Sequence, residues 1–139
     1  MAGYSATPLV KKLGIKENIN AALVNAPPGF QTELDLPHGV TINSRTRRPL
    51  DFVLLFVKSK RELESKFLLY AARLASSGML WVSWPKKASG VVTDLTDNVV
   101  REMGLAKGMV DVKVCAVDDV WSGLKFVFRL RDREAVKPR

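Results

Sequence analysis

The stretch Phe52-Val53-Leu54-Leu55-Phe56-Val57 decides the fold of this 139-residue chain. It is an unbroken apolar run without alternation, which is the pattern of a strand covered on both faces, as in parallel sheets. Ser59 and Glu62 follow as a capping box, and apolar residues recur behind them at helical spacing, so the sequence predicts a helix over 60–75. A strand over 79–84 comes next, stopped by a proline.

The N-terminal third contributes one short helix and two further strands. Thr7 is placed to act as N-cap, Pro8 suits the first helical turn, and Gly14 stands past the end of the helix. The apolar residues 19–24 then form a run of strand length, and 40–43 is a brief second strand. These elements add strands to the predicted sheet.

The C-terminal third predicts a second long helix and a closing pair of strands. Apolar residues keep the helical period over 95–106, and a strand over 110–117 follows. The turn Trp121-Ser122-Gly123 leads into 124–130, where apolar and polar residues alternate as in an edge strand. Because the last two strands are too close for a crossover, they form an antiparallel hairpin. The predicted fold is α/β: a reduced Rossmann-like sheet, mostly parallel, with a C-terminal antiparallel hairpin and packed helices.

Composition indicates one soluble domain over 1–133, followed by a basic flexible tail, 134–139. The chain is 47% hydrophobic and 26% charged, which is the balance of a globular protein. Its apolar runs fall far short of the roughly 20 residues that a bilayer requires, so we expect a cytoplasmic protein. The single Cys115 excludes an internal disulfide, and neither Cys115 nor the lone His38 has partners in sequence for a metal site or a catalytic triad.

Three segments resemble the second half of the S-adenosylmethionine-dependent methyltransferase fold. Leu50-Asp51-Phe52-Val53-Leu54 is similar to its fourth strand, Ala72-Arg73-Leu74-Ala75-Ser76-Ser77-Gly78-Met79-Leu80 to the turn entering its fifth, and 110–130 to its closing hairpin. The resemblance implies a methyltransferase-like fold and leaves the function open.

The chain as a whole resembles a family of short, uncharacterised bacterial proteins. The matching segments are Gly3-Tyr4-Ser5, Thr7-Pro8-Leu9, Trp81-Val82-Ser83-Trp84-Pro85-Lys86-Lys87-Ala88-Ser89-Gly90, Asp111-Val112-Lys113-Val114-Cys115-Ala116-Val117 and Trp121-Ser122-Gly123-Leu124. This resemblance implies a domain of unknown function and supplies no catalytic residues.

The segments that would bind a cofactor in this fold depart from its pattern. Asn25-Ala26-Pro27-Pro28-Gly29-Phe30 stands where a glycine-rich turn presents backbone N–H groups, and its two prolines have none to present. Asn43-Ser44-Arg45 stands where an acidic residue binds ribose hydroxyls. We therefore expect no cofactor and a non-enzymatic binding module, with a divergent methyltransferase as an alternative.

The expected binding site is the 84–90 loop, because ligands of open α/β sheets bind at the carboxyl ends of the strands. Its basic and polar residues suit an anionic ligand or a partner segment, while Asp94 and Asp97 beside it would repel an anion. A purely structural turn and a protein-interaction loop are the alternatives. The candidate ligand-binding residues are Trp84, Lys86, Lys87, Ser89, Gly90 and Trp121.

The net charge of +8 raises nucleic-acid binding as a second function. Solubility alone is the simpler explanation of this charge. The candidate phosphate-contacting residues are Arg45, Arg47, Arg48, Arg129, Arg131 and Arg133. The exposed edge of strand 124–130 also suggests a homodimer, formed by strand pairing across a two-fold axis.

Overall fold

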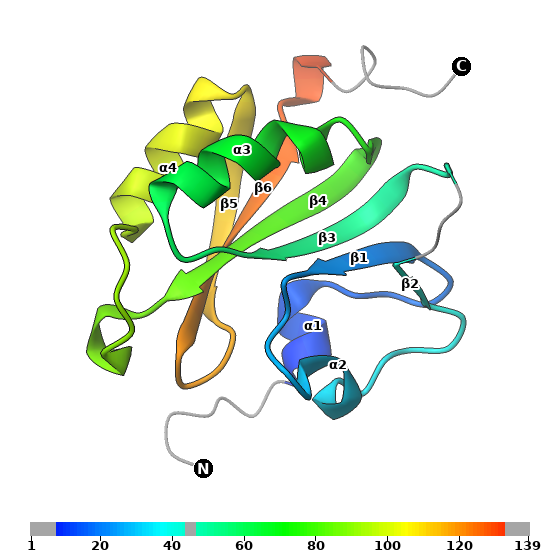
Figure 1. Ribbon diagram of the computed structural model, residues 1–139. Helices are drawn as coiled ribbons and strands as arrows, with labels where there is room; N and C mark the ends of the chain where they lie inside the picture. The colour runs from blue at the N-terminus through cyan, green and yellow to red at the C-terminus, as the bar shows by residue number, and fades with distance from the viewer. Residues whose placement is uncertain (1–7, 44–46, 133–139) are drawn as a thin grey trace.

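Six strands form one sheet in the order β2-β1-β3-β4-β6-β5 (Figure 1). This computed structural model describes residues 8–43 and 47–132. The strands are β1 (Asn20–Val24), β2 (Thr41–Ile42), β3 (Leu50–Phe56), β4 (Leu74–Pro85), β5 (Met109–Ala116) and β6 (Trp121–Phe128). The first four are parallel, and β6 pairs antiparallel with both β4 and β5. The predicted fold class, a mostly parallel Rossmann-like sheet with a C-terminal antiparallel hairpin, is confirmed.

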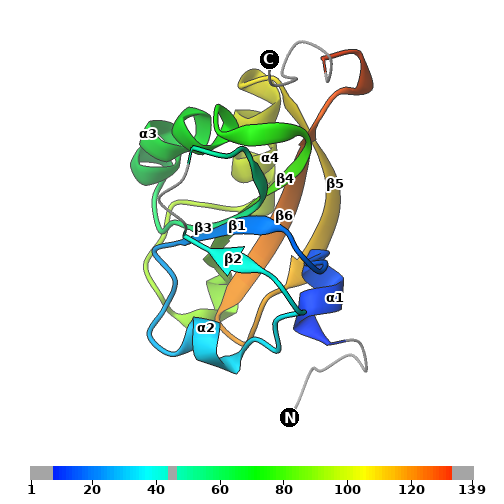
Figure 2. The same cartoon turned by 90° about the vertical axis from the view of Figure 1, so that its right-hand side faces the viewer.

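Helices cover both faces of this sheet, which explains the continuous apolar run of β3. The α-helices are α1 (Leu9–Leu13), α2 (Phe30–Glu33), α3 (Lys60–Ala71) and α4 (Asp97–Ala106), and two short 3-10 helices are η1 (Lys87–Ser89) and η2 (Leu130–Asp132). Buried residues form one cluster between the sheet and α3 with α4, and another between the sheet and α1 with α2. The two helix pairs therefore lie on opposite faces (Figure 2). None of the described helices has the length and apolar character of a membrane span.

The predicted helix over 60–75 is too long by four residues. Its N-terminus is as expected, because the Ser59 hydroxyl accepts a hydrogen bond from the Glu62 N–H at 3.1 Å. The helix ends at Ala71, however, and Leu74 already pairs with Leu50 of β3. The residues 75–78 then form a bulge in β4, where a side chain on Gly78 would approach the Leu50 carbonyl to 2.9 Å. A strand partner distant in sequence has overridden the helical spacing.

The prediction that strand 124–130 lies at the edge of the sheet is wrong as well. Strand β6 lies between β4 and β5, so β5 is the edge of the sheet and 124–130 offers no free edge for dimer formation. Residues Trp121-Ser122-Gly123 belong to β6 and do not form the connecting turn. The edge strand β5 carries a register shift between Asp111 and Lys113, and bulges and charges of this kind oppose pairing with another edge.

Other element boundaries differ by a few residues. Pro8 occupies the N-cap position of α1 with an extended ψ of 147°, and the proposed cap Thr7 lies outside the described residues. Pro85 does not end the pairing of β4, since it still lies opposite Trp121 and the next N–H, that of Lys86, donates to Val120. The second long helix begins at Asp97, with Thr96 as its N-cap and Leu95 buried ahead of it.

Candidate functional site

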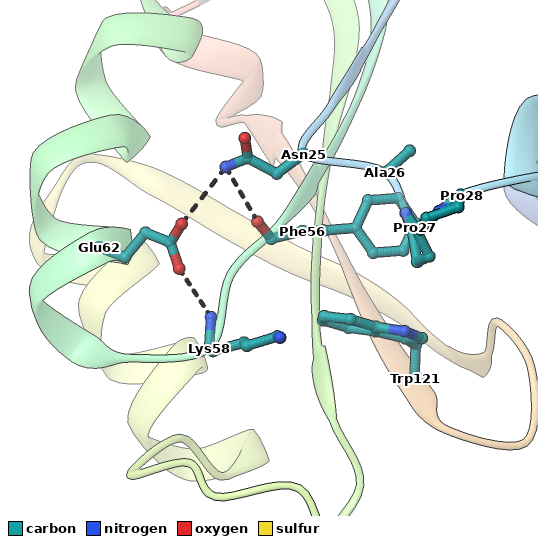
Figure 3. A pocket seen from close by; sticks show the side chains of 8 residues that line it. All are labelled: Asn25, Ala26, Pro27, Pro28, Phe56, Lys58, Glu62 and Trp121. Atoms are coloured by element: carbon teal, nitrogen blue, oxygen red, sulfur yellow. Dashed lines mark hydrogen bonds between the residues drawn. The ribbon is translucent and has the colours of Figure 1, made fainter.

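The chain reverses direction across the sheet next to β1. From β1 it passes outward to β2 and then returns to the other side of β1 to form β3. In open α/β sheets the crevice at such a topological switch point is where ligands bind, outside the carboxyl ends of the strands. A hollow of about 390 Å³ opens there (Figure 3). It is lined by Asn25, Ala26, Pro27, Pro28, Phe56, Lys58, Glu62 and Trp121.

The apolar wall of this hollow is built from two strands, β3 and β6, with the loop after β1 beside them. Phe56 ends β3 and is 1% exposed, and its ring meets that of Trp121 edge-on, with centroids 5.0 Å apart. Phe30 of α2 contacts the Phe56 ring from another side, also at 5.0 Å. Because Phe56 is held by two aromatic neighbours, the wall is formed before any ligand arrives. Pro27, after β1, faces the same space (Figure 3).

The polar wall consists of Asn25, Lys58 and Glu62. The Glu62 carboxylate accepts hydrogen bonds from the Lys58 backbone N–H at 2.9 Å and from the Asn25 amide at 3.3 Å. Asn25 has a φ of 59°, a left-handed conformation that asparagine tolerates better than most residues. The Lys58 side chain is exposed, points away from Glu62 toward Trp121 (Figure 3), and makes no ion pair with a described carboxylate. It is the one cation among the lining residues.

The N-terminus of α3 adjoins the hollow but is already occupied. The Ser59 hydroxyl and the Asp94 carboxylate accept hydrogen bonds from Glu62 and Lys60 N–H groups, at 3.1 and 2.8 Å. A free helix N-terminus is a ready site for a phosphate. Here Asp94 and Glu62 supply the negative charge themselves, so a phosphate would meet repulsion. The hollow is suited to an apolar group that carries a single negative charge and is poorly suited to a pyrophosphate.

The predicted 84–90 loop lies at the carboxyl end of β4, as expected, but outside the lining of the hollow. Trp84 is 4% exposed and packs in the cluster under α3 and α4, so it is not available to stack on a ligand. The Ser89 hydroxyl donates to the Lys86 carbonyl at 2.6 Å and accepts from Val91, and the Gly90 N–H donates to Lys87. These donors are engaged within the loop. Ligand binding by the Lys86 and Lys87 side chains stays a prediction.

Of the predicted ligand-binding residues, only Trp121 lines the hollow. Sequence reasoning missed Asn25, Phe56, Lys58 and Glu62 because it placed the site at one strand end and not between two. The turn after β1 lacks the glycine-rich pattern of a cofactor site, so its sequence offered no positive signal for ligand binding. A different signal for this site was present in the sequence. A polar residue follows each of the predicted strands β1 and β3 by one or two positions: Asn25 after β1 and Lys58 after β3.

The predicted nucleic-acid residues gather at the opposite end of the sheet. Arg47 and Arg48 precede β3, and Arg129 and Arg131 follow β6, which runs in the reverse direction. All four therefore lie toward the amino ends of the parallel strands, away from the hollow. Arg45 and Arg133 lie outside the described residues. Nucleic-acid binding by these arginines stays a prediction.

The titratable groups elsewhere supply no reaction centre among the described residues. Cys115 is half-buried, and this burial raises the pKa of its thiol, which disfavours the nucleophilic thiolate. Within residues 8–43 and 47–132, no three His, Cys, Asp or Glu side chains lie together in a way that would hold a metal ion.

Comparisons with known proteins do not show a family. No family model and no curated protein matches the chain. Among solved structures, magnesium protoporphyrin IX methyltransferase from Synechocystis PCC 6803 with bound SAH is similar at 11% identity and a TM-score of 0.49, covering 87% of this chain and 78% of that one. The same enzyme with bound SAM has 10% identity, a TM-score of 0.47 and coverages of 87% and 74%. The PH0226 protein from Pyrococcus horikoshii OT3 has 10% identity, a TM-score of 0.47 and coverages of 87% and 86%. The fold assignment rests on the strand order of this chain, and membership of an uncharacterised bacterial family stays a prediction.

Proposed function

We propose that this protein is a binding module that holds a small apolar carboxylate in the hollow between the ends of β1 and β3. The observation that carries the proposal is the meeting of a preformed aromatic wall, Phe56 and Trp121, with the unpaired ammonium of Lys58 at the topological switch point. Ligand sites commonly have this composition, with apolar walls and a few polar groups that fix the orientation.

The size and charge of the ligand follow from the lining. A hollow of about 390 Å³ falls in the lower part of the range for small-molecule sites, roughly 300–1,000 Å³. One ammonium suits one negative charge, and the acids at the N-terminus of α3 oppose a doubly charged phosphate. An aromatic ring or branched chain bearing one carboxylate fits both conditions.

Binding without chemistry is the simplest reading of the lining. Lys58 and Glu62 are its only charged residues, and the Glu62 carboxylate already accepts hydrogen bonds from two donors. A divergent methyltransferase is the alternative, and it requires S-adenosylmethionine to bind in the same hollow.

A thermal-shift screen tests the proposal. The panel contains aromatic and branched carboxylates, nucleotides and S-adenosylmethionine, because any ligand that binds the native state raises the apparent melting temperature. We expect carboxylates to stabilise the protein and to quench tryptophan fluorescence through Trp121. Stabilisation by S-adenosylmethionine alone would favour the methyltransferase, and no shift with any compound would overturn the proposal.

Three variants locate the site. Lys58→Met removes the ammonium and keeps the backbone N–H that Glu62 accepts, so we expect carboxylate affinity to fall about tenfold while the fold is kept. Lys66→Met, on α3, is the matched control with the same charge change. The pair Lys86→Ala with Lys87→Ala tests the 84–90 loop. Unchanged binding by Lys58→Met, or equal losses in Lys58→Met and its control, would reject the hollow as the site.

Nucleic-acid binding is a second candidate function, favoured by the gathering of arginines at the amino ends of the parallel strands. Contacts with phosphates release counterions, so the affinity for DNA or RNA should fall steeply as salt is raised. A gel shift with Arg47→Gln and Arg48→Gln measures this. Absence of any complex at low salt would dismiss the candidate.

A further inference from the structure

Two lysines lie directly opposite each other on the last two strands. Lys113 of β5 pairs in register with Lys125 of β6, and both side chains lie on the sheet face that carries α1. Like charges in directly opposed positions of an antiparallel pair destabilise a sheet. Departures from a local stability rule of this kind are expected at functional or strained sites.

The C-terminal end of α1 packs beside this pair, and Lys12 and Lys16 stand at and just beyond that end. The Lys113 ammonium donates to the Lys12 carbonyl at 2.8 Å, and the Trp81 indole N–H donates to the Leu13 carbonyl at 2.8 Å. Trp81, Lys125 and Lys113 form one row across β4, β6 and β5. The end of α1 is therefore anchored by Trp81 and Lys113, which lie on either side of Lys125 in this row.

The four lysines Lys12, Lys16, Lys113 and Lys125 form what we call the lysine cluster. Burial lowers the pKa of Lys125, and the neighbouring charges of Lys113 and Lys16 lower it further. The charges of Lys12 and Lys113 lower the pKa of the Cys115 thiol, against the larger opposite effect of its burial. Lys113 and Lys16 are therefore close enough to Lys125 for their charges to act on it.

No carboxylate compensates this charge among the described residues. The ion pairs found there are Arg101–Asp111, Lys107–Glu64 and Arg131–Asp132, and none includes a member of the lysine cluster. Asp111, the nearest acid along β5, is engaged by the Arg101 side chain at 2.9 Å. The cluster thus forms no ion pair with a described carboxylate, and its positive charge would attract an anion from solution.

We propose that the lysine cluster binds a phosphate group, carried either by a small phosphorylated molecule or by a nucleic-acid backbone. Lysine binds phosphate as a point charge, and the in-register pair Lys113 and Lys125 lies beside the lysine-bearing end of α1. This site is separate from the hollow, and the proposal does not depend on the proposed function. The unfavourable Lys113–Lys125 pair is the cost of assembling it.

The experiment uses two probes on the full chain. Pyrophosphate and a single-stranded oligonucleotide are titrated separately at low salt by calorimetry, with the variant Lys125→Met. The matched control is Lys66→Met, which removes another partly buried lysine from the opposite face of the sheet. Lys58→Met is the second control and separates this site from the hollow.

We expect at least one probe to bind, with affinity reduced about tenfold in Lys125→Met and unchanged in both controls. Without a probe, Lys125→Met should melt at a higher temperature than the parent protein, because a like-charge pair has been removed. Binding of pyrophosphate identifies a small phosphate ligand, and binding of the oligonucleotide alone identifies a nucleic-acid backbone. Absence of binding by both probes, or equal losses in Lys125→Met and Lys66→Met, would overturn the proposal.

Discussion

Substituting Gly104 with alanine tests how tightly α4 is packed on the sheet. Gly104 is buried where α4 crosses Phe126 of β6. A Cβ atom there would overlap the Cε1 and Cζ atoms of the Phe126 ring and would lie 2.7 Å from Cδ1. The ring has no room to move away, since it is fully buried and packs edge-on against Phe67 at a centroid distance of 5.4 Å.

Two opposing effects set the magnitude. Alanine gains about 1 kcal/mol over glycine in a helix interior. Overpacking a core costs about 1–3 kcal/mol, and a direct overlap with a fixed ring belongs at the upper end of that range. We therefore expect Gly104→Ala to lower the free energy of unfolding by about 2 kcal/mol. With an unfolding entropy of roughly 2.1 cal/mol/K per residue, the melting temperature falls by about 7 °C.

Urea unfolding of Gly104→Ala, Phe126→Leu and the double variant measures this effect as a thermodynamic cycle. In the Phe126→Leu background the overlap is relieved, so Gly104→Ala should become neutral or stabilising. A rise in stability on Gly104→Ala in the parent protein would refute the reasoning, because the helix propensity would then outweigh the clash.

Two further predictions concern buried polar and charged groups. The Asn20 amide donates to the carbonyls of Arg48 and Pro49, both at 3.2 Å. Asn20→Asp places an oxygen against these two acceptors, so the free energy of unfolding in urea at neutral pH should fall by about 3 kcal/mol. An unchanged urea midpoint would contradict these hydrogen bonds. Burial and neighbouring lysines lower the pKa of Lys125 in the folded protein below its ordinary value of 10.5. Between these two pKa values the unfolded chain binds more protons than the folded protein does. The contribution of Lys125 to stability therefore rises with pH in this window. The stability advantage of Lys125→Met over the parent protein should therefore shrink as the pH is raised through that window, as followed by thermal unfolding; an advantage that grows with pH would show that the like-charge repulsion has been misassigned.

Local signals in the sequence were sufficient for most of the secondary structure. The apolar run of β3 and the Ser59–Glu62 cap of α3 are properties of neighbouring residues, and both are confirmed. The predicted end of α3 was wrong because Leu74 fits both the helical spacing and a position in a paired strand. Its place was decided by Leu50, 24 residues earlier in the chain, which pairs with it across the sheet.

The candidate site was predictable only in its general location. The carboxyl edge of the sheet follows from the parallel strands, but the switch point depends on the order of those strands. That order places Asn25 and Lys58 on either side of one hollow and leaves Trp84 buried on the other face. The alternation around Lys125 signalled a wet face, yet it did not distinguish an edge strand from an interior strand only partly covered by α1.

The sequence by itself determined the α/β class, the parallel core and the hairpin that closes it, because periodicity, caps and turn residues act over a few positions. Only the tertiary structure decided which strand lies at the edge, where the hollow opens and which lysines meet. These features depend on contacts between residues far apart in the chain. Lys113 and Lys12 are separated by 101 positions, and the hydrogen bond that joins them exists only when α1 packs on the sheet.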